Sequence, residues 1–156
     1  MQHRIVLGLG SNLGDSATIL GQAVESLSAF ITDLRKSSTY QTEPVGGPVQ
    51  PRYWNAVLVG LTDLEPEELL LKTQQIEARY GRLRTVRWGP RTLDIDLIDY
   101  DGIIWDSPTL ILPHPLAHQR AFVLVPWNEV DPEAILIGHG FVKSILKTLD
   151  LSVIVR

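Results

Sequence analysis

The order of strand-like and helix-like patterns along the chain predicts an α+β fold, with helices packed against a mostly antiparallel sheet. Two helical patterns, one over residues 16–30 and one that begins at Pro66, each lie between apolar stretches typical of strands. The chain has 156 residues, enough for one domain with a sizeable core, and it contains no internal repeat. We therefore expect a single domain over residues 1–156.

The first half of the chain predicts three strands and one helix. Residues 5–9 are apolar and bounded by glycine, as in a buried first strand. The glycines beside this strand are expected to permit a tight turn into an amphipathic helix over residues 16–30. Residues 35–42 and 53–61 predict the second and third strands, and the proline- and glycine-rich segment 43–51 predicts a long loop between them.

The second half predicts a helix, a strand and further short elements. Pro66 occupies the preferred first position of a helix, and Gly81 is a natural stop. Residues 92–100 alternate as a strand, residues 122–126 predict a last strand, and residues 142–149 predict a C-terminal helix. The order strand–helix–strand–strand–helix–strand is that of a ferredoxin-like βαββαβ core.

A cationic segment precedes the strand predicted over residues 92–100. Five arginines fall within thirteen residues with no acid between them: Arg79, Arg82, Arg84, Arg87 and Arg91. The planar guanidinium donates two parallel hydrogen bonds and so suits phosphate oxygens. The segment therefore predicts a phosphate-binding arm, with a solvated charged loop as the plain alternative.

Two carboxylates follow this arm on one side of the predicted strand. Alternation places the first set of side chains on one face (Leu93, Ile95, Leu97) and the second on the other (Asp94, Asp96, Ile98, Tyr100). Two like charges this close repel each other unless a cation or the arginines neutralise them. Because Mg²⁺ prefers carboxylates alongside substrate phosphates, the pair predicts a divalent metal site.

Composition and missing motifs exclude several classes of protein. The net charge of −4 argues against a protein that coats nucleic acid, and the absence of cysteine excludes disulfides and thiolate metal sites. The chain has no P-loop motif, and Leu13 occupies the position where a dinucleotide fingerprint requires glycine. No apolar run approaches the roughly 18 residues of a membrane helix, and we expect a cytoplasmic protein without a signal peptide.

Five motifs, in order and across nearly the whole chain, resemble the 6-hydroxymethyl-7,8-dihydropterin pyrophosphokinase family of folate biosynthesis. They are GSNLGD, YQTEPVGGPVQPRYWNAV, TQQIEARYGRLR, RWGPRTLDIDLI and LPHPLAHQRAFVLVP. The resemblance implies a three-layer α-β-α sandwich. It also implies an ATP-dependent transferase that moves a diphosphate to the hydroxymethyl group of the pterin and releases AMP. Two small-molecule substrates, a monomeric chain and no nucleic-acid or membrane partner are expected.

The resemblance also assigns roles to individual side chains. Asp94 and Asp96 would hold two Mg²⁺ ions, and Arg82 and Arg91 would join them in catalysis. Contacts with ATP are implied for Gln74, Glu77, Arg82, Arg84, Trp88, Arg91, Leu97, Ile111, His114 and Arg120. Contacts with the pterin are implied for Thr42, Glu43, Val45, Tyr53, Asn55 and Phe122. The resemblance gives no role to Arg79 or Arg87, and the chain departs from the family pattern at Glu43, Thr109 and Pro115.

Three other functions are compatible with the residues. The first is a ferredoxin-like nucleic-acid-binding module in which Tyr53, Trp88 and Phe122 stack on bases. Salt-sensitive RNA binding without ATP turnover would favour it. The second is an ordinary kinase that transfers the γ-phosphate, which would release ADP rather than AMP. The third is a catalytically inactive regulatory relative.

Overall fold

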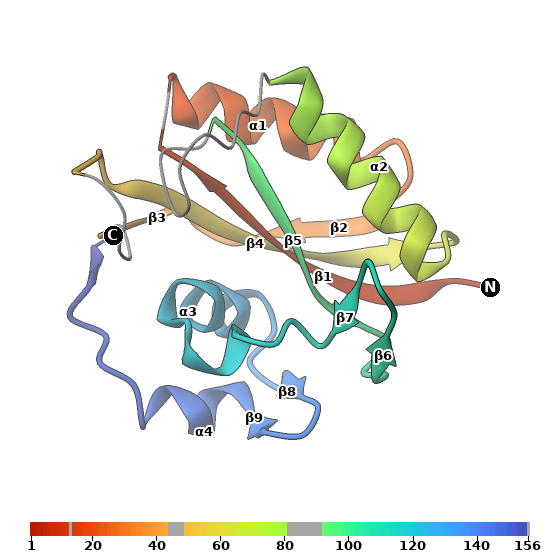
Figure 1. Ribbon diagram of the computed structural model, residues 1–156. Helices are drawn as coiled ribbons and strands as arrows, with labels where there is room; N and C mark the ends of the chain where they lie inside the picture. The colour runs from red at the N-terminus through yellow and green to blue at the C-terminus, as the bar shows by residue number, and fades with distance from the viewer. Residues whose placement is uncertain (13, 44–48, 81–91, 156) are drawn as a thin grey trace.

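The computed structural model describes residues 1–12, 14–43, 49–80 and 92–155 (Figure 1). The main sheet has six strands in the order β10–β3–β4–β1–β5, and β2 also pairs with β4. The strands are β1 (His3–Ser11), β2 (Thr32–Lys36), β3 (Tyr40–Thr42), β4 (Tyr53–Thr62), β5 (Asp94–Tyr100) and β10 (Ile154–Val155). Every pairing between these described strands is antiparallel, as the sequence predicted.

Helices cover both faces of the sheet. Figure 1 shows α1 (Ser16–Leu27) and α2 (Pro66–Arg79) on one face, and α3 (Ala121–Val130) and α4 (Val142–Leu146) on the other. The short elements are β6 (Trp105–Asp106), β7 (Ile111–Leu112), η1 (Ala117–Gln119), β8 (Ile135–Leu136) and β9 (Gly140–Phe141). The result is three layers, with the sheet in the middle. No helix in the described ranges is both long enough and apolar enough to cross a membrane.

Each face of the sheet has its own hydrophobic core. Leu7 and Leu58 point to the α1–α2 side, and Val6 and Val57 point to the α3–α4 side. The central strands β1 and β4 are thus buried on both faces, which explains why their sequences are almost continuously apolar. The burial of these strands fixes the sheet that carries the functional residues.

The apolar run 122–126, predicted as a strand, is the first half of helix α3. A short apolar run is compatible with either structure, and periodicity over five residues cannot separate them. Packing selects the helix, because Val123, Leu124 and Trp127 lie at helical spacing and pack together on the sheet. The prediction was therefore wrong: helix α3 begins here, and Arg120, the residue before it, lies near Asp96 of β5.

The predicted strand over residues 35–42 is divided into β2 and β3. Ser37 lies between them, is buried, and accepts a hydrogen bond from the backbone N–H of Val57 through its hydroxyl at 2.9 Å. The Ser37 hydroxyl takes the place of a backbone carbonyl as the acceptor for this N–H and interrupts the strand. The first helix also ends earlier than predicted, at Leu27, where the Ser28 hydroxyl donates to the Glu25 carbonyl.

An irregularity in the pairing of β1 with β5 changes which way the end of β5 faces. Val6 pairs with Asp99, whereas the next residue, Leu7, pairs with Leu97. Because β5 has one extra residue there, Tyr100 lies in the α1–α2 core and not on the face of Asp94 and Asp96 that simple alternation predicted. The Tyr100 hydroxyl donates to the Leu64 carbonyl at 2.6 Å.

Candidate active site

A cleft of about 450 Å³ opens between the sheet and the start of α3, and we call it the active-site cleft. It brings together residues that are far apart in the sequence. The residues with a predicted site role that line it are Thr42, Glu43, Tyr53, Asn55, Asp94, Asp96, Arg120 and Phe122. Five further residues with a predicted site role lie outside the described residues: Val45, Arg82, Arg84, Trp88 and Arg91.

Asp94 and Asp96 lie on the floor of this cleft, opposite two glycines of β1. Gly10 pairs with Asp94, and Gly8 pairs with Asp96. A Cβ atom on Gly10 would lie 3.9 Å from the Asp94 Cβ, and one on Gly8 would lie 4.0 Å from the Asp96 Cβ. The missing side chains leave space beside both carboxylates. Gly8 and Gly10 are therefore strand residues that shape the site, not the turn glycines that we expected.

The turn into α1 uses a different glycine. Gly14 has a φ of 77°, which favours glycine, and Asp15 caps the helix by accepting from the Thr18 N–H at 3.3 Å. The spacing of two between Gly8 and Gly10 was the signal that could have identified them, because it places both on one face of a strand.

Positive charge faces the two carboxylates from the other wall of the cleft. The Arg120 Nη1 lies 3.8 Å from Asp96 Oδ2, and the guanidinium lies 5.4 Å from the centre of the Phe122 ring. Arg120 also precedes α3, whose first residues line the cleft. The first N–H groups of a helix have no partner inside it and carry partial positive charge, so this wall favours phosphate oxygens.

A polar aromatic region adjoins the carboxylates. The Asn55 side chain donates through Nδ2 to the Thr42 hydroxyl at 2.7 Å, and both residues are buried. This hydrogen bond fixes the amide so that Oδ1 faces Gly10, where an added Cβ would lie 3.1 Å away. Tyr53 and Phe122 supply rings to the same cleft. An oriented amide between aromatic rings suits a flat heterocycle with a hydrogen-bonding edge.

Glu77 supports the strand of the two aspartates instead of opening to the cleft. Its carboxylate is buried and accepts the backbone N–H of Ile95, the residue between Asp94 and Asp96, at 2.9 Å. Gln74, one turn earlier on α2, is exposed. The sequence did carry a signal for the role of Glu77, because it follows Thr73 and Ile76 on the buried stripe of α2.

His114 is held neutral close to Arg120. Burial, and then the charge of Arg120, lower the pKa of the imidazole to about 4. The Nδ1 atom accepts the Leu116 N–H at 3.2 Å, so the ring proton of the neutral form is on Nε2. The backbone N–H of His114 donates to the Ile98 carbonyl at 3.0 Å and ties this segment to β5.

The β6–β7 hairpin is fastened to α2 by Glu67. The Trp105 indole donates to Glu67 at 3.2 Å, and the hydroxyls of Ser107 and Thr109 also donate to this carboxylate. These bonds, that of Ser107 first, lower the pKa of Glu67. Ile111 on this hairpin is exposed. Leu97, which was also expected to contact ATP, is buried in the α1–α2 core.

The residues of the active-site cleft indicate a class of enzyme. A carboxylate pair faces an arginine and a helix start, and an aromatic region with an oriented amide adjoins them. This combination binds a polyphosphate next to a flat polar ring. We conclude that the fold carries an enzyme of phosphate transfer.

Comparison with known proteins gives the family. The family model for 7,8-dihydro-6-hydroxymethylpterin-pyrophosphokinase (HPPK) matches residues 6–132. The chain is 44% identical over 155 residues to the 2-amino-4-hydroxy-6-hydroxymethyldihydropteridine pyrophosphokinase of Methylorubrum extorquens, covering 98% of both chains. It is 44% identical over 132 residues to the Bacillus subtilis enzyme of the same name, covering 83% of this chain and 79% of that one. The chain belongs to the HPPK family.

Solved structures agree with the fold. The wild-type HPPK-DHPS of Plasmodium falciparum matches with a TM-score of 0.74 at 14% identity, over 95% of this chain and 44% of that one. This chain therefore spans less than half of that protein, and the likeness concerns the fold. As a member of the HPPK family, the chain catalyses pyrophosphoryl transfer from ATP to hydroxymethyldihydropterin in folate biosynthesis, as the sequence predicted.

Proposed function

We propose that the active-site cleft holds both substrates, with the phosphates of ATP at Asp94 and Asp96 and the pterin between Tyr53 and Phe122. One observation carries this proposal: the carboxylate pair and the aromatic region line a single cleft. A transfer between two substrates requires their reacting atoms to be close, and one shared cleft supplies that closeness.

The donor set of this cleft fits Mg²⁺. Asp94 and Asp96 offer two carboxylates with open space beside them, and in the described ranges no third histidine, cysteine or acid joins them in a metal-binding group. A cation that takes its remaining ligands from phosphates and water suits such a pair. Bound there as two ions, magnesium would neutralise charge on the triphosphate.

In the proposed reaction the hydroxymethyl oxygen of the pterin bonds to the β-phosphorus of ATP. The bond from that phosphorus to the oxygen bridging to the α-phosphate breaks, AMP leaves with this oxygen, and the hydroxyl proton is released. Arg120 and the start of α3 stabilise the spread negative charge. We assign Arg82 and Arg91 to the same task, and Arg84 and Trp88 to ATP binding. No side chain is assigned as a general base.

Substrate recognition is divided between the two ends of the cleft. Asn55, held by Thr42, reads the polar edge of the pterin, and we assign Glu43 and Val45 to pterin contacts as well. At the nucleotide end, we assign Ile111, Gln74 and the Nε2–H of His114 to contacts with ATP. Leu97 and Glu77 are assigned a supporting role, because their side chains are buried behind β5.

Mg²⁺ binding to the assigned carboxylates tests the proposal directly. We expect Asp94→Asn to weaken Mg²⁺ binding in the presence of a non-hydrolysable ATP analogue by about tenfold or more. Asp150→Asn is the matched control, because Asp150 lines the same cleft but accepts the backbone N–H of Ser152 at 2.9 Å. Equal Mg²⁺ affinity in the Asp94 variant and the wild type would overturn the metal assignment without bearing on the family.

Nucleotide analysis after incubation with Mg²⁺, ATP and 6-hydroxymethyl-7,8-dihydropterin checks the direction of transfer. We expect AMP that depends on the pterin, whereas ADP would indicate transfer of the γ-phosphate alone. If the aromatic region holds the pterin, an Asn55→Ala variant should lose pterin-dependent AMP formation and retain ATP binding.

We also propose a ferredoxin-like core, a single domain and a monomer that acts in the cytoplasm. The sheet order and the one sheet shared by all the main elements support the first two proposals. A chain without cysteine suits a reducing compartment. Sedimentation at micromolar concentration tests the monomer, and a dimeric species would contradict it.

A further inference from the structure

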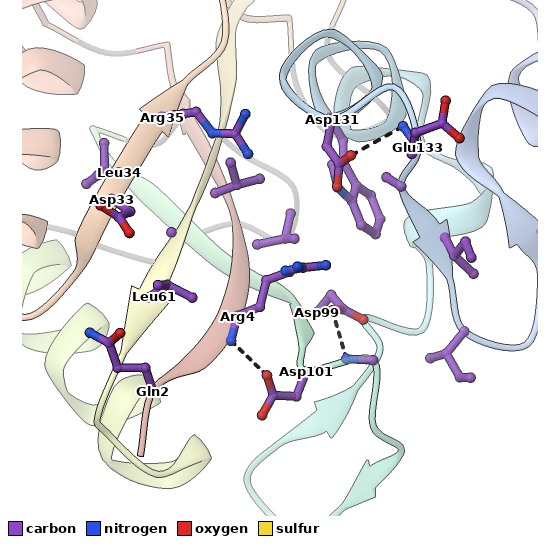
Figure 2. Close-up of a pocket in the computed structure, with 18 residues that line it drawn as sticks. Gln2, Arg4, Asp33, Leu34, Arg35, Leu61, Asp99, Asp101, Asp131 and Glu133 are labelled. Atoms are coloured by element: carbon purple, nitrogen blue, oxygen red, sulfur yellow. Dashed lines mark hydrogen bonds between the residues drawn. The ribbon is translucent and has the colours of Figure 1, made fainter.

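A second cleft, larger than the active-site cleft, lies at the other end of α3, and we call it the distal cleft (Figure 2). Its volume is about 1050 Å³, and it shares none of its described lining residues with the active-site cleft. One wall is the sheet, with Arg4 on β1 and Arg35 on β2. The other wall contains Trp127 and Asp131 at the end of α3, and Asp99 of β5 also lines the cleft.

Two buried polar atoms of the distal cleft have no hydrogen-bond partner in the described structure. The Asp99 side chain is 6% exposed; its Oδ2 accepts the Gly102 N–H at 3.1 Å, but its Oδ1 accepts nothing. Trp127 is 2% exposed, and its indole Nε1–H donates to nothing. Buried donors and acceptors are nearly always satisfied by protein, water or ligand, so one of each in the same cleft marks a place where a bound molecule can both donate and accept.

The charges of the distal cleft are of both signs. Two of its acids already have partners, because Asp101 lies 2.6 Å from His3 and Glu133 lies 3.7 Å from Lys143. Among the described residues, Arg4 and Arg35 have no carboxylate within ion-pair distance of 4.0 Å.

Charges of both signs face the cleft: Arg4, Arg35, Asp33 and Asp99 lie on strands of the sheet, and Asp131 lies at the end of α3. In Figure 2 the Arg4 and Arg35 side chains reach from the sheet toward the side that carries Asp131, and Asp99 lies below it. A simple anion would meet Asp33, Asp99 and Asp131, and a simple cation would meet the two arginines. A ligand with both charges satisfies both sets of side chains.

We propose that the distal cleft binds a small zwitterion of the α-amino-acid type. The guanidinium groups of Arg4 and Arg35 receive the carboxylate, because this group accepts paired N–H donors. The ammonium group donates to Asp99 Oδ1 and to Asp131. The unpartnered indole N–H of Trp127 donates to an oxygen of the ligand. Because the Asp99 and Trp127 atoms are buried, binding includes a small turn of these side chains toward the cleft.

The indole N–H of Trp127 provides a direct readout of binding. The chain has four tryptophans, so a ¹⁵N-labelled sample gives few indole signals, and Trp127→Phe identifies the relevant one. Glycine and L-glutamate are the probes. We expect each to shift the Trp127 signal saturably, with a dissociation constant of roughly 1 mM. The Trp105 indole, already bound to Glu67, should not move.

Single-charge compounds and charge variants decide the outcome. Acetate and methylamine should bind at least about tenfold more weakly than glycine, because each leaves the side chains of one charge without a partner. Arg35→Ala and Asp131→Asn should each weaken glycine binding about tenfold. Lys147→Ala, which removes an exposed cation outside the cleft, should leave it unchanged.

Three results would overturn the proposal. They are a shift that stays linear to the highest glycine concentration, an equal response to acetate, and an equal glycine affinity in the Arg35 variant. Arg35 is exposed, so its replacement should not unfold the chain, and a melting curve of each variant checks this. None of these readouts uses turnover, so the result is independent of the active-site assignments.

Discussion

Asp96 and Asp99 lie three positions apart on β5 and have opposite environments. The Asp96 side chain is 37% exposed, lines the active-site cleft and faces Arg120, whereas Asp99 is buried and lines the distal cleft. The extra residue between Leu97 and Asp99 turns Asp99 to the α3–α4 side, which Asp96 already faces by alternation. One strand therefore serves two clefts, because an irregularity in pairing can redirect a side chain without changing the sheet.

Replacement of the two aspartates should give the largest contrast. We expect Asp96→Ala to lower turnover by roughly a thousandfold, because a ligand to the phosphate-binding cation is lost where charge develops. Asp99→Asn should leave kcat/KM nearly unchanged. Pterin-dependent AMP formation measures both, and a similar loss in both variants would remove the functional distinction between the clefts.

A variant of an arginine that we assign to catalysis separates chemistry from binding. Arg82→Ala, outside the described residues, should slow single-turnover transfer by about a hundredfold and change ATP affinity far less. Arg4→Ala, at the distal cleft, should change neither. Rapid-quench kinetics and equilibrium ATP binding measure the two quantities. Weakened ATP binding with unchanged single-turnover chemistry would show that Arg82 is a binding residue only.

Substitution of two glycines of the sheet should separate an effect on the active site from an effect on stability. In Gly10→Ala the new Cβ would lie 3.1 Å from Asn55 Oδ1, so we expect the KM for the pterin to rise about tenfold at nearly unchanged stability. In Gly60→Ala the Cβ would lie 2.5 Å from Ile31 Cγ2 and 3.0 Å from the Thr32 carbonyl, which should cost about 1–3 kcal/mol of stability. Urea titration and steady-state kinetics on both variants measure these effects. A destabilised Gly10 variant with unchanged KM, or a stable Gly60 variant with raised KM, would contradict the expectation.

The pH dependence of stability should have opposite signs at His114 and at Asp99. Burial lowers the pKa of His114 to about 4, so its contribution is present above its unfolded pKa of 6.5 and is lost as pH falls toward 4. Burial raises the pKa of Asp99 above 3.8, so its contribution is present below 3.8 and is lost as pH rises through the raised value.

Variants make these two small effects measurable. His114→Gln should flatten the loss of stability between pH 6.5 and 4, and Asp99→Asn should flatten the loss above pH 3.8. Denaturation with urea across this range gives the free energy of unfolding of each variant. Unchanged slopes relative to the wild type would show that neither group titrates differently in the folded and unfolded chains.

Local pattern was sufficient for the antiparallel α+β fold and for the shared direction of Asp94 and Asp96, because strand alternation depends only on neighbouring residues. It failed at Tyr100, where the pairing of β1 with β5 decides the face. It also failed at residues 122–126, where tertiary packing selects a helix. The stripe of α2 indicates that Glu77 is buried, but its hydrogen bond with the distant Ile95 N–H follows from no local pattern.

The hairpin fastened by Glu67 has a consequence for how this family can diversify. β6 and β7 form a two-stranded sheet of their own, outside the main ladder, and side-chain hydrogen bonds from Trp105, Ser107 and Thr109 secure it to α2. Insertions or exchanges at its tip would leave the backbone pairing of the main sheet intact. Evolution or an engineer can therefore alter the length and composition of this hairpin while Asp94 and Asp96 keep their positions.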